Sequence, residues 1–172
     1  MKILIFSDNH GDRDNIERII KKHEPLDRII SLGDSEMREF ELSNLGIIGV
    51  KGNYPFEPKF PYELSFSFSG VSVYFTHGHH YHVKMGLTKL LQKAYNEKYN
   101  IVCFGHTHQV YLEEVMDIIL VNPGALSFSR SHQNPSYGII DIDDEKISVL
   151  IYKVYGNKLK SLTKKRKDNE FK

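Results

Sequence analysis

The sequence predicts an α/β protein with two β-sheets and helices outside them. Two observations predict this class. Over residues 1–50, short apolar runs alternate with amphipathic segments, and this β-α-β-α-β order is typical of a parallel sheet with helical crossovers. Beyond residue 60 the chain is rich in strand-like stretches, several of them alternating, with a single helical segment among them, which favours antiparallel pairing.

Three buried strands are expected in the first half, because short continuous apolar runs are typical of strands covered on both faces. After the first strand, Ile16 and Ile19 have helical spacing, and either Asp12 or Asp14 is placed to cap this helix. His23 is expected to be partly protonated near the C-terminal end of that helix. The strands are the runs 2–6, 28–32 and 47–50.

Two further helices are expected. Met37, Phe40 and Leu45 can form the apolar face of a helix that ends at Gly46. A longer amphipathic helix is predicted over 85–99, with Leu87, Leu90, Leu91, Ala94 and Tyr95 at helical spacing.

The second half is expected to be built mostly of strands. Leu64, Phe66 and Phe68 alternate onto one face, and Gly70 turns the chain back into 71–75, which predicts an antiparallel hairpin in a second sheet or at a sheet edge. Further strands are expected at 101–104, 110–115, 117–121, 137–143 and 147–155.

The composition is that of a one-domain globular protein, with 172 residues, 40% of them hydrophobic and 26% charged. Cys103 is the single cysteine, which excludes an intramolecular disulfide and suits a reducing cytoplasm. No stretch approaches the ~20 apolar residues of a membrane span, so we expect a cytoplasmic protein without a membrane partner. Residues 157–172 hold seven basic and two acidic residues, and we expect them to form a basic, flexible tail behind a domain of residues 1–156.

Five predicted strands end in loops that offer Asp, His or Asn beside a glycine. Each loop alone is ordinary, but the carboxyl ends of strands in such sheets converge on one rim. Carboxylates and imidazoles suit Zn, Mn, Fe, Ni or Co better than Ca or Mg, and the candidate ligands are too many for one ion. We therefore expect two divalent transition metal ions as cofactors. The candidate ligands are Asp8, His10, Asp34, Asn53, His77, His106 and His108.

The order of these loops resembles the five sequence blocks of the calcineurin-like metallophosphoesterase superfamily, in its small single-domain bacterial and archaeal phosphodiesterase branch. The resemblance implies a four-layer α/β/β/α sandwich of two mixed sheets flanked by helices, over a metallophosphoesterase domain of residues 1–156. It also implies a dinuclear-metal-dependent phosphodiesterase or phosphatase. The blocks are "DNH" (8–10), "GD" (33–34), "GN" (52–53), "HGH" (77–79) and "GHTH" (105–108), with "NPGA" (122–125) and Arg130 after them.

The resemblance also implies roles for these residues. Asp8, His10, Asp34 and His108 would surround one metal, and Asp34, Asn53, His77 and His106 the other, so that Asp34 bridges the ions. A hydroxide between the ions would attack phosphorus in line. Asp34, Asn53, His77 and His79 form the expected catalytic set, in which His79 supports the ligands or contacts substrate phosphate. His80, His82 and His132 are expected to be solvated bystanders.

The third block departs from the family pattern, because Tyr54 and Pro55 stand where a His or Cys and then an acid are usual. Ala125 likewise replaces the serine of an Asn-Pro-Gly-Ser stretch. These changes leave an alternative open, a catalytically weakened metal-binding scaffold for protein–protein interaction. The intact ligand set favours the enzyme.

A small phosphodiester or nucleotide-like substrate is expected at a rim without a capping insertion. A nucleic acid is a less favoured partner, which the basic tail leaves open. The stretch 53–62 holds three prolines and four aromatic residues. It is a candidate to shape the substrate site or to join copies in a homo-oligomer, and a rigid surface crossing is an equal alternative.

Overall fold

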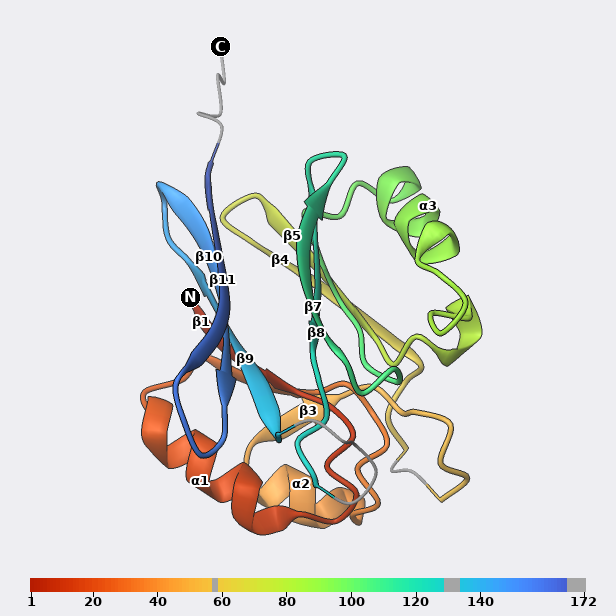
Figure 1. Ribbon diagram of the computed structural model, residues 1–172, viewed down its shortest axis with the longest axis vertical. Coiled ribbons are helices and arrows are strands. Elements are labelled where there is room, and N and C mark those ends of the chain that lie inside the picture. The colour runs from red at the N-terminus through yellow and green to blue at the C-terminus, as the bar shows by residue number, and fades with distance from the viewer. Residues whose placement is uncertain (57–58, 129–133, 167–172) are drawn as a thin grey trace.

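Two mixed β-sheets lie face to face in the computed structural model, which describes residues 1–56, 59–128 and 134–166 (Figure 1). The larger sheet has the strand order β11-β10-β9-β1-β2-β3. Its parallel part is β1, β2 and β3, and its antiparallel part joins β1 to β9, β10 and β11. The strands are β1 (Lys2–Phe6), β2 (Arg28–Ser31), β3 (Ile47–Gly49), β9 (Ser136–Ile142), β10 (Lys146–Lys153) and β11 (Lys158–Lys165).

The smaller sheet has the order β4-β5-β6-β8-β7. The predicted hairpin forms its edge, since β4 and β5 pair antiparallel, and β5, β6 and β8 run parallel. The last pair, β7 and β8, is antiparallel. The strands are β4 (Glu63–Phe68), β5 (Val71–Thr76), β6 (Ile101–Cys103), β7 (Val110–Val115) and β8 (Ile118–Pro123).

Apolar side chains fill three layers of core and confirm the four-layer α/β/β/α arrangement. The central layer lies between the sheets and contains Ile5 of β1 and Phe75 of β5. Helices α1 (Arg13–His23) and α2 (Glu39–Asn44) cover the outer face of the larger sheet, and α3 (Thr88–Asn96) covers that of the smaller one (Figure 1). Among the described residues, none of the helices has the length and apolar character needed to span a membrane.

Details of the helices differ from the expectation. Asp12 is the residue that caps α1, and its side chain accepts a hydrogen bond from the backbone N–H of Asn15 at 3.0 Å. The expected partial charge on His23 is wrong, because burial, Lys2 and Lys22 lower its pKa to about 4. The ring is therefore neutral at pH 7.

The apolar faces of α2 and α3 are narrower than predicted. Phe40 lies in α2 but is 58% exposed. The helix starts only at Glu39, so the buried Met37 lies before the helix and does not share a helical face with Phe40. In α3, Leu90 and Ala94 are buried while Tyr95 is exposed. A short helix on a sheet needs only one buried row of side chains. Apolar residues at helical spacing therefore predict a wider buried face than the helix has.

The predicted flexible tail from residue 157 is wrong for Lys158–Lys165, which form β11. This strand pairs antiparallel with β10 at the edge of the larger sheet. Leu162 packs on the central core, and the ammonium group of Lys164 binds Asp117, in the turn between β7 and β8, at 2.6 Å. The strand thus connects the two sheets, and residues 167–172 lie outside the described residues.

Candidate metal centre

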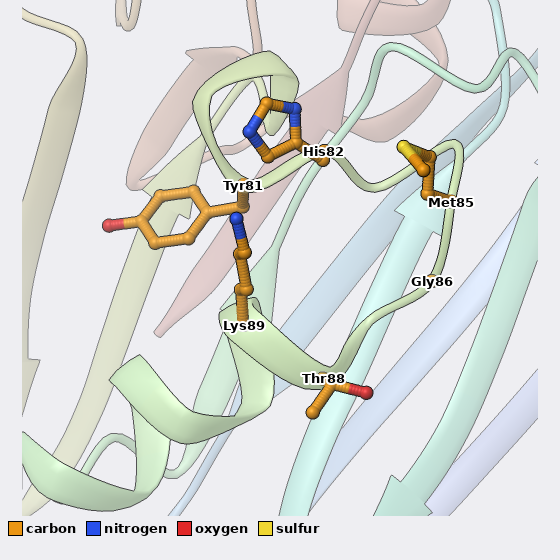
Figure 2. A pocket seen from close by; sticks show the side chains of 6 residues that line it. All are labelled: Tyr81, His82, Met85, Gly86, Thr88 and Lys89. Carbon is orange, nitrogen blue, oxygen red and sulfur yellow. The ribbon is translucent and has the colours of Figure 1, made fainter.

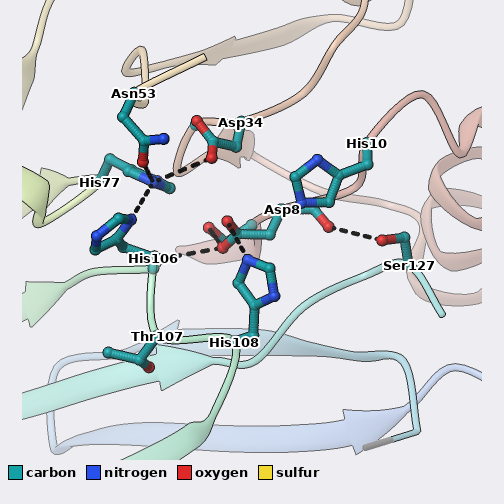
Figure 3. A network of polar contacts seen from close by, with 12 residues as sticks. Asp8, His10, Asp34, Asn53, His77, His106, Thr107, His108 and Ser127 are labelled. Carbon is teal, nitrogen blue, oxygen red and sulfur yellow. Dashed lines mark hydrogen bonds and ion pairs between the residues drawn. The ribbon is translucent and has the colours of Figure 1, made fainter. Parts of the chain in front are cut away.

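The loops that follow β1, β2, β3, β5 and β6 meet at one end of the two sheets, where Figure 3 shows the seven candidate ligands facing a common centre. Backbone hydrogen bonds tie these loops together. The N–H of Asp8 donates to the carbonyl of Gly33 at 3.0 Å, that of His10 to Asp34 at 3.3 Å, and that of Gly105 to His77 at 3.1 Å. The structure therefore brings together the residues that the sequence placed at separate strand ends.

The backbone at these ligands adopts a conformation that residues other than glycine rarely take. Asp8, His10, Asp34, His106 and His108 all have φ between 44° and 67°. Left-handed backbone costs energy in non-glycine residues, although Asp and His tolerate it better than most. Such strain persists where the surrounding structure enforces it and is typical of functional sites.

Two glycines make room for the carboxylates. A Cβ atom on Gly52 would overlap Oδ1 of Asp34, and one on Gly105 would overlap the hydroxyl of Ser7, which donates to Oδ2 of Asp8 at 2.5 Å. The glycines that flank the polar residues in the sequence are thus required by close approach of neighbouring loops.

Asp8, His10 and His108 form one cluster, with ligand atoms within 4.8 Å of one another. Nε2 of His108 lies 3.0 Å from Oδ1 of Asp8. Apart from this contact, Oδ1 of Asp8 is a buried oxygen without a donor among the described residues, and Nε2 of His10 is a buried nitrogen without a hydrogen-bond partner there. Buried polar atoms of this kind are rare in proteins, and their chemistry suits the binding of a cation.

Asp8, Asp34 and His77 form a second cluster of ligand atoms within 4.8 Å. Nδ1 of His77 lies 2.7 Å from the carbonyl of Leu32, so Nδ1 carries the proton and Nε2 presents a lone pair in the neutral ring. The acceptor oxygens of Asn53 and Asp34 nevertheless approach this Nε2 to 3.2 and 3.6 Å (Figure 3). A proton on Nε2 or a bound cation would stabilise this arrangement, and a metal ion held jointly by His77, Asn53 and Asp34 is one such cation.

His106 completes the second cluster. Its Nδ1 lies 3.2 Å from Nε2 of His77. Burial, His77 and Lys84 lower the pKa of His106 to about 4, so the ring is neutral at pH 7 and able to bind metal. Burial raises the pKa of Asp8, but contacts with His108, His77 and Ser7 outweigh it, and the pKa lies below the usual value. Both groups are therefore in the state that a metal ligand requires.

Several supporting residues were missed by the sequence analysis. The carboxylate of Glu36 lies 2.7 Å from Nδ1 of His10, which leaves Nε2 for a metal. Asn122 donates to the carbonyl of Gly105 at 2.9 Å, and the hydroxyl of Ser127 donates to the carbonyl of Asp8 at 3.1 Å. Glu36 follows Asp34 by two residues and has a left-handed backbone, which no residue type in the sequence signals.

The third block keeps its contact with Asp34 despite its altered side chains. The backbone N–H of Tyr54 donates to Oδ1 of Asp34 at 3.0 Å. This bond needs no particular side chain at position 54. Tyr54 and Pro55 therefore leave the position of the Asp34 carboxylate oxygens unchanged in this respect.

Of the three histidines that follow His77, His79 lies beside the candidate ligands. The His79 ring is 5.4 Å from that of His77 and 6.1 Å from that of His106. His80 is exposed, and the exposed His82 lines a separate hollow of about 230 Å³ with Met85, Thr88 and Lys89 (Figure 2). Arg130 and His132 lie outside the described residues.

Several known proteins with similar sequences and structures are phosphoesterases. Residues 1–145 match the model of the calcineurin-like phosphoesterase superfamily domain. This chain belongs to that family. A probable metallophosphoesterase of Bacillus subtilis is 31% identical, over 94% of this chain and 96% of the relative. A phosphodiesterase of Methanocaldococcus jannaschii is 29% identical, over 88% of this chain and 99% of the relative. A predicted phosphoesterase from Streptococcus pneumoniae TIGR4 has a crystal structure that superposes with a TM-score of 0.84, at 28% identity, over 96% of this chain and 97% of its own.

Family membership and the site agree on divalent metal chemistry. Metallophosphoesterases use divalent metals, and the family and the names of these relatives indicate a hydrolase that acts on phosphate esters. The residues present fit such ions, because imidazoles and carboxylates converge at one place and two of their buried atoms have no hydrogen-bond partner among the described residues.

Proposed function

We propose that this protein is a dinuclear-metal-dependent phosphodiesterase that acts on small phosphodiesters or nucleotide-like esters. When bound, two divalent ions would supply an acidified water for in-line attack on phosphorus and neutralise charge on the phosphoryl oxygens. The observation that carries the proposal is the convergence of the Asn53 and Asp34 oxygens on Nε2 of His77, beside the cluster of Asp8, His10 and His108.

The ligand sets follow from this proposal. One ion would take Asp8, His10 and His108, whose atoms already cluster, and the other would take Asn53, His77 and His106. Asp34 would bridge the two, a role supported by its position beside both Asp8 and His77. His79 would contact the substrate phosphate, since its ring lies next to both His77 and His106.

The weakened-scaffold alternative rests on Tyr54 and Pro55 in the third block. With no histidine there to protonate the leaving group, the enzyme would favour esters with good leaving groups.

A cytoplasmic location is part of the proposal and is supported by the single cysteine, Cys103, which is buried and free.

An Asp34→Ala variant tests the site assignment. Loss of the bridging carboxylate is expected to lower the turnover of bis(p-nitrophenyl) phosphate at least about 100-fold, as is typical for the loss of electrostatic groups at a reacting centre. His82→Ala is the matched control, because His82 is exposed and lines a hollow away from the ligands. Equal losses in the two variants would contradict the assignment.

A further inference from the structure

A chain of side-chain contacts leads outward from the metal centre to a lysine on the rim. The His79 ring, beside His77, lies 5.9 Å from the ring of Tyr62. The ammonium nitrogen of Lys51 lies over the same Tyr62 ring, 4.1 Å from its centroid. Three side-chain contacts therefore connect a candidate ligand, His77, to a surface cation.

Tyr62 and its neighbours hold this cation in place. The His80 ring packs against Tyr62 with a centroid distance of 4.6 Å, and the backbone N–H of Lys51 donates to the carbonyl of Pro61 at 2.9 Å. An aromatic face attracts an ammonium group and restricts where it lies. The Tyr62 ring thus favours one position of the Lys51 ammonium group over free extension into solvent.

No acid of the described residues 1–56, 59–128 and 134–166 forms an ion pair with Lys51, since none of their carboxylates lies within ion-pair distance of its ammonium group. Glu63, the acid next to Tyr62 in the chain, is engaged elsewhere, because it accepts a hydrogen bond from Tyr81 at 2.6 Å and lies 4.0 Å from Lys93. Lys84 adds a second positive charge near His106. Lys51 and Lys84 are therefore two positive charges that can attract anions, one over Tyr62 and the other near His106.

We propose that Lys51, held by Tyr62, binds a second phosphate group of the substrate. The inference rests on the proposed function and narrows it, from phosphodiesters in general to diesters that carry a further phosphate, as in a nucleoside 3′,5′-bisphosphate ester. Lysine binds phosphate as a point charge, and the ammonium group keeps N–H donors on the side that faces away from the ring.

Binding of two nucleotides that differ in one phosphate tests this inference without requiring turnover. We expect manganese-loaded protein to bind thymidine 3′,5′-bisphosphate about tenfold more tightly than thymidine 5′-phosphate, in line with one charge-assisted contact. Lys51→Gln is expected to abolish that difference. Tyr62→Phe, which keeps the ring, is expected to preserve it, and Tyr62→Leu to reduce it. Calorimetric titration measures all four proteins.

Lys59→Gln is the matched control, since it removes the same charge from an exposed residue of the neighbouring loop. Equal affinity for the two nucleotides, or a difference that Lys51→Gln retains, would overturn the inference. Turnover of bis(p-nitrophenyl) phosphate is measured on the same samples. Turnover without Lys51-dependent binding sinks the inference alone, whereas Lys51-dependent binding without turnover sinks the proposed function alone.

Discussion

Two of the candidate ligands are oriented through the ring nitrogen that faces away from the metal centre. His77 uses Nδ1 to donate to the carbonyl of Leu32, and His10 uses Nδ1 to contact Glu36. Each contact selects the tautomer with a free Nε2 and fixes the ring plane. A carboxylate in this position also makes the imidazole a stronger ligand, so Glu36 is expected to act on the metal through His10.

Glu36→Ala is expected to weaken metal binding by about 10–100-fold, the usual effect of losing such a partner. Glu36→Gln keeps an oxygen that accepts from Nδ1 and is expected to lose less. The measurement is competition for metal between the stripped protein and a chromophoric chelator. Glu39→Ala serves as the control, because it removes an equal charge from an exposed position. Unchanged affinity in Glu36→Ala would show that His10 needs no such support.

The candidate ligands could be predicted from the sequence at the residue scale, but their supporting partners could not. Asp8, His77 and His106 share a position at strand ends, so topology alone predicts that they converge. Glu36 depends on a left-handed backbone with φ of 54°, which no residue type signals. The contact of Asp34 with the Tyr54 amide uses backbone and is equally invisible in the sequence.

At the scale of elements, β11 has a larger part than its composition suggests. It covers the edge of β10, contributes Leu162 to the core between the sheets, and contacts the turn after β7 through Lys164. The guanidinium of Arg166 also donates to the carbonyl of Ser69, in the hairpin between β4 and β5. Strand β11 and the following Arg166 therefore link the larger sheet to both edges of the smaller sheet, at β7 and at the β4–β5 hairpin.

A chain that ends at Asn157 is expected to lose about 2 kcal/mol or more of unfolding free energy. The partly buried Leu162 contributes less than the ~1.5–3 kcal/mol of a fully buried side chain, and the hydrogen bonds between β10 and β11 are lost as well. The exposed ion pairs of Lys164 add little to this sum. Urea denaturation measures the difference. A chain that ends at Arg166 keeps all of β11 and is the control. Equal stability of the two truncated chains would contradict the role given to this strand.

Sequence patterns identified the buried strands and missed β11 for a physical reason. β1 and β8 are covered on both faces, so their apolar runs are continuous. β11 is an edge strand with Leu159 and Leu162 as its only large apolar residues, three positions apart rather than two. Lysines on an edge strand protect the edge from pairing with other chains. A lysine-rich composition is also typical of disordered segments, so the sequence of β11 resembles that of a disordered tail.

At the scale of the whole molecule, the sandwich explains why the site lies where it does. Strands of both sheets end at the same rim, and the loops after β1 and β2 contribute to the centre together with those after β5 and β6. The family resemblance predicted this architecture correctly, including the two mixed sheets. Substrate identity is a different matter, since it depends on rim residues such as Lys51 and Tyr62 that lie outside the shared blocks.

Metal-restored hydrolysis tests the central claim, a dinuclear phosphodiesterase centre, most directly. Chelator-stripped protein is assayed on bis(p-nitrophenyl) phosphate with Mn, Ni, Zn, Co or Mg added back singly, and bound metal is counted by elemental analysis of the same samples. Restoration of turnover by a transition metal, with two ions per chain, is the predicted result. Two ions bound without turnover for any metal would contradict the account and favour the scaffold.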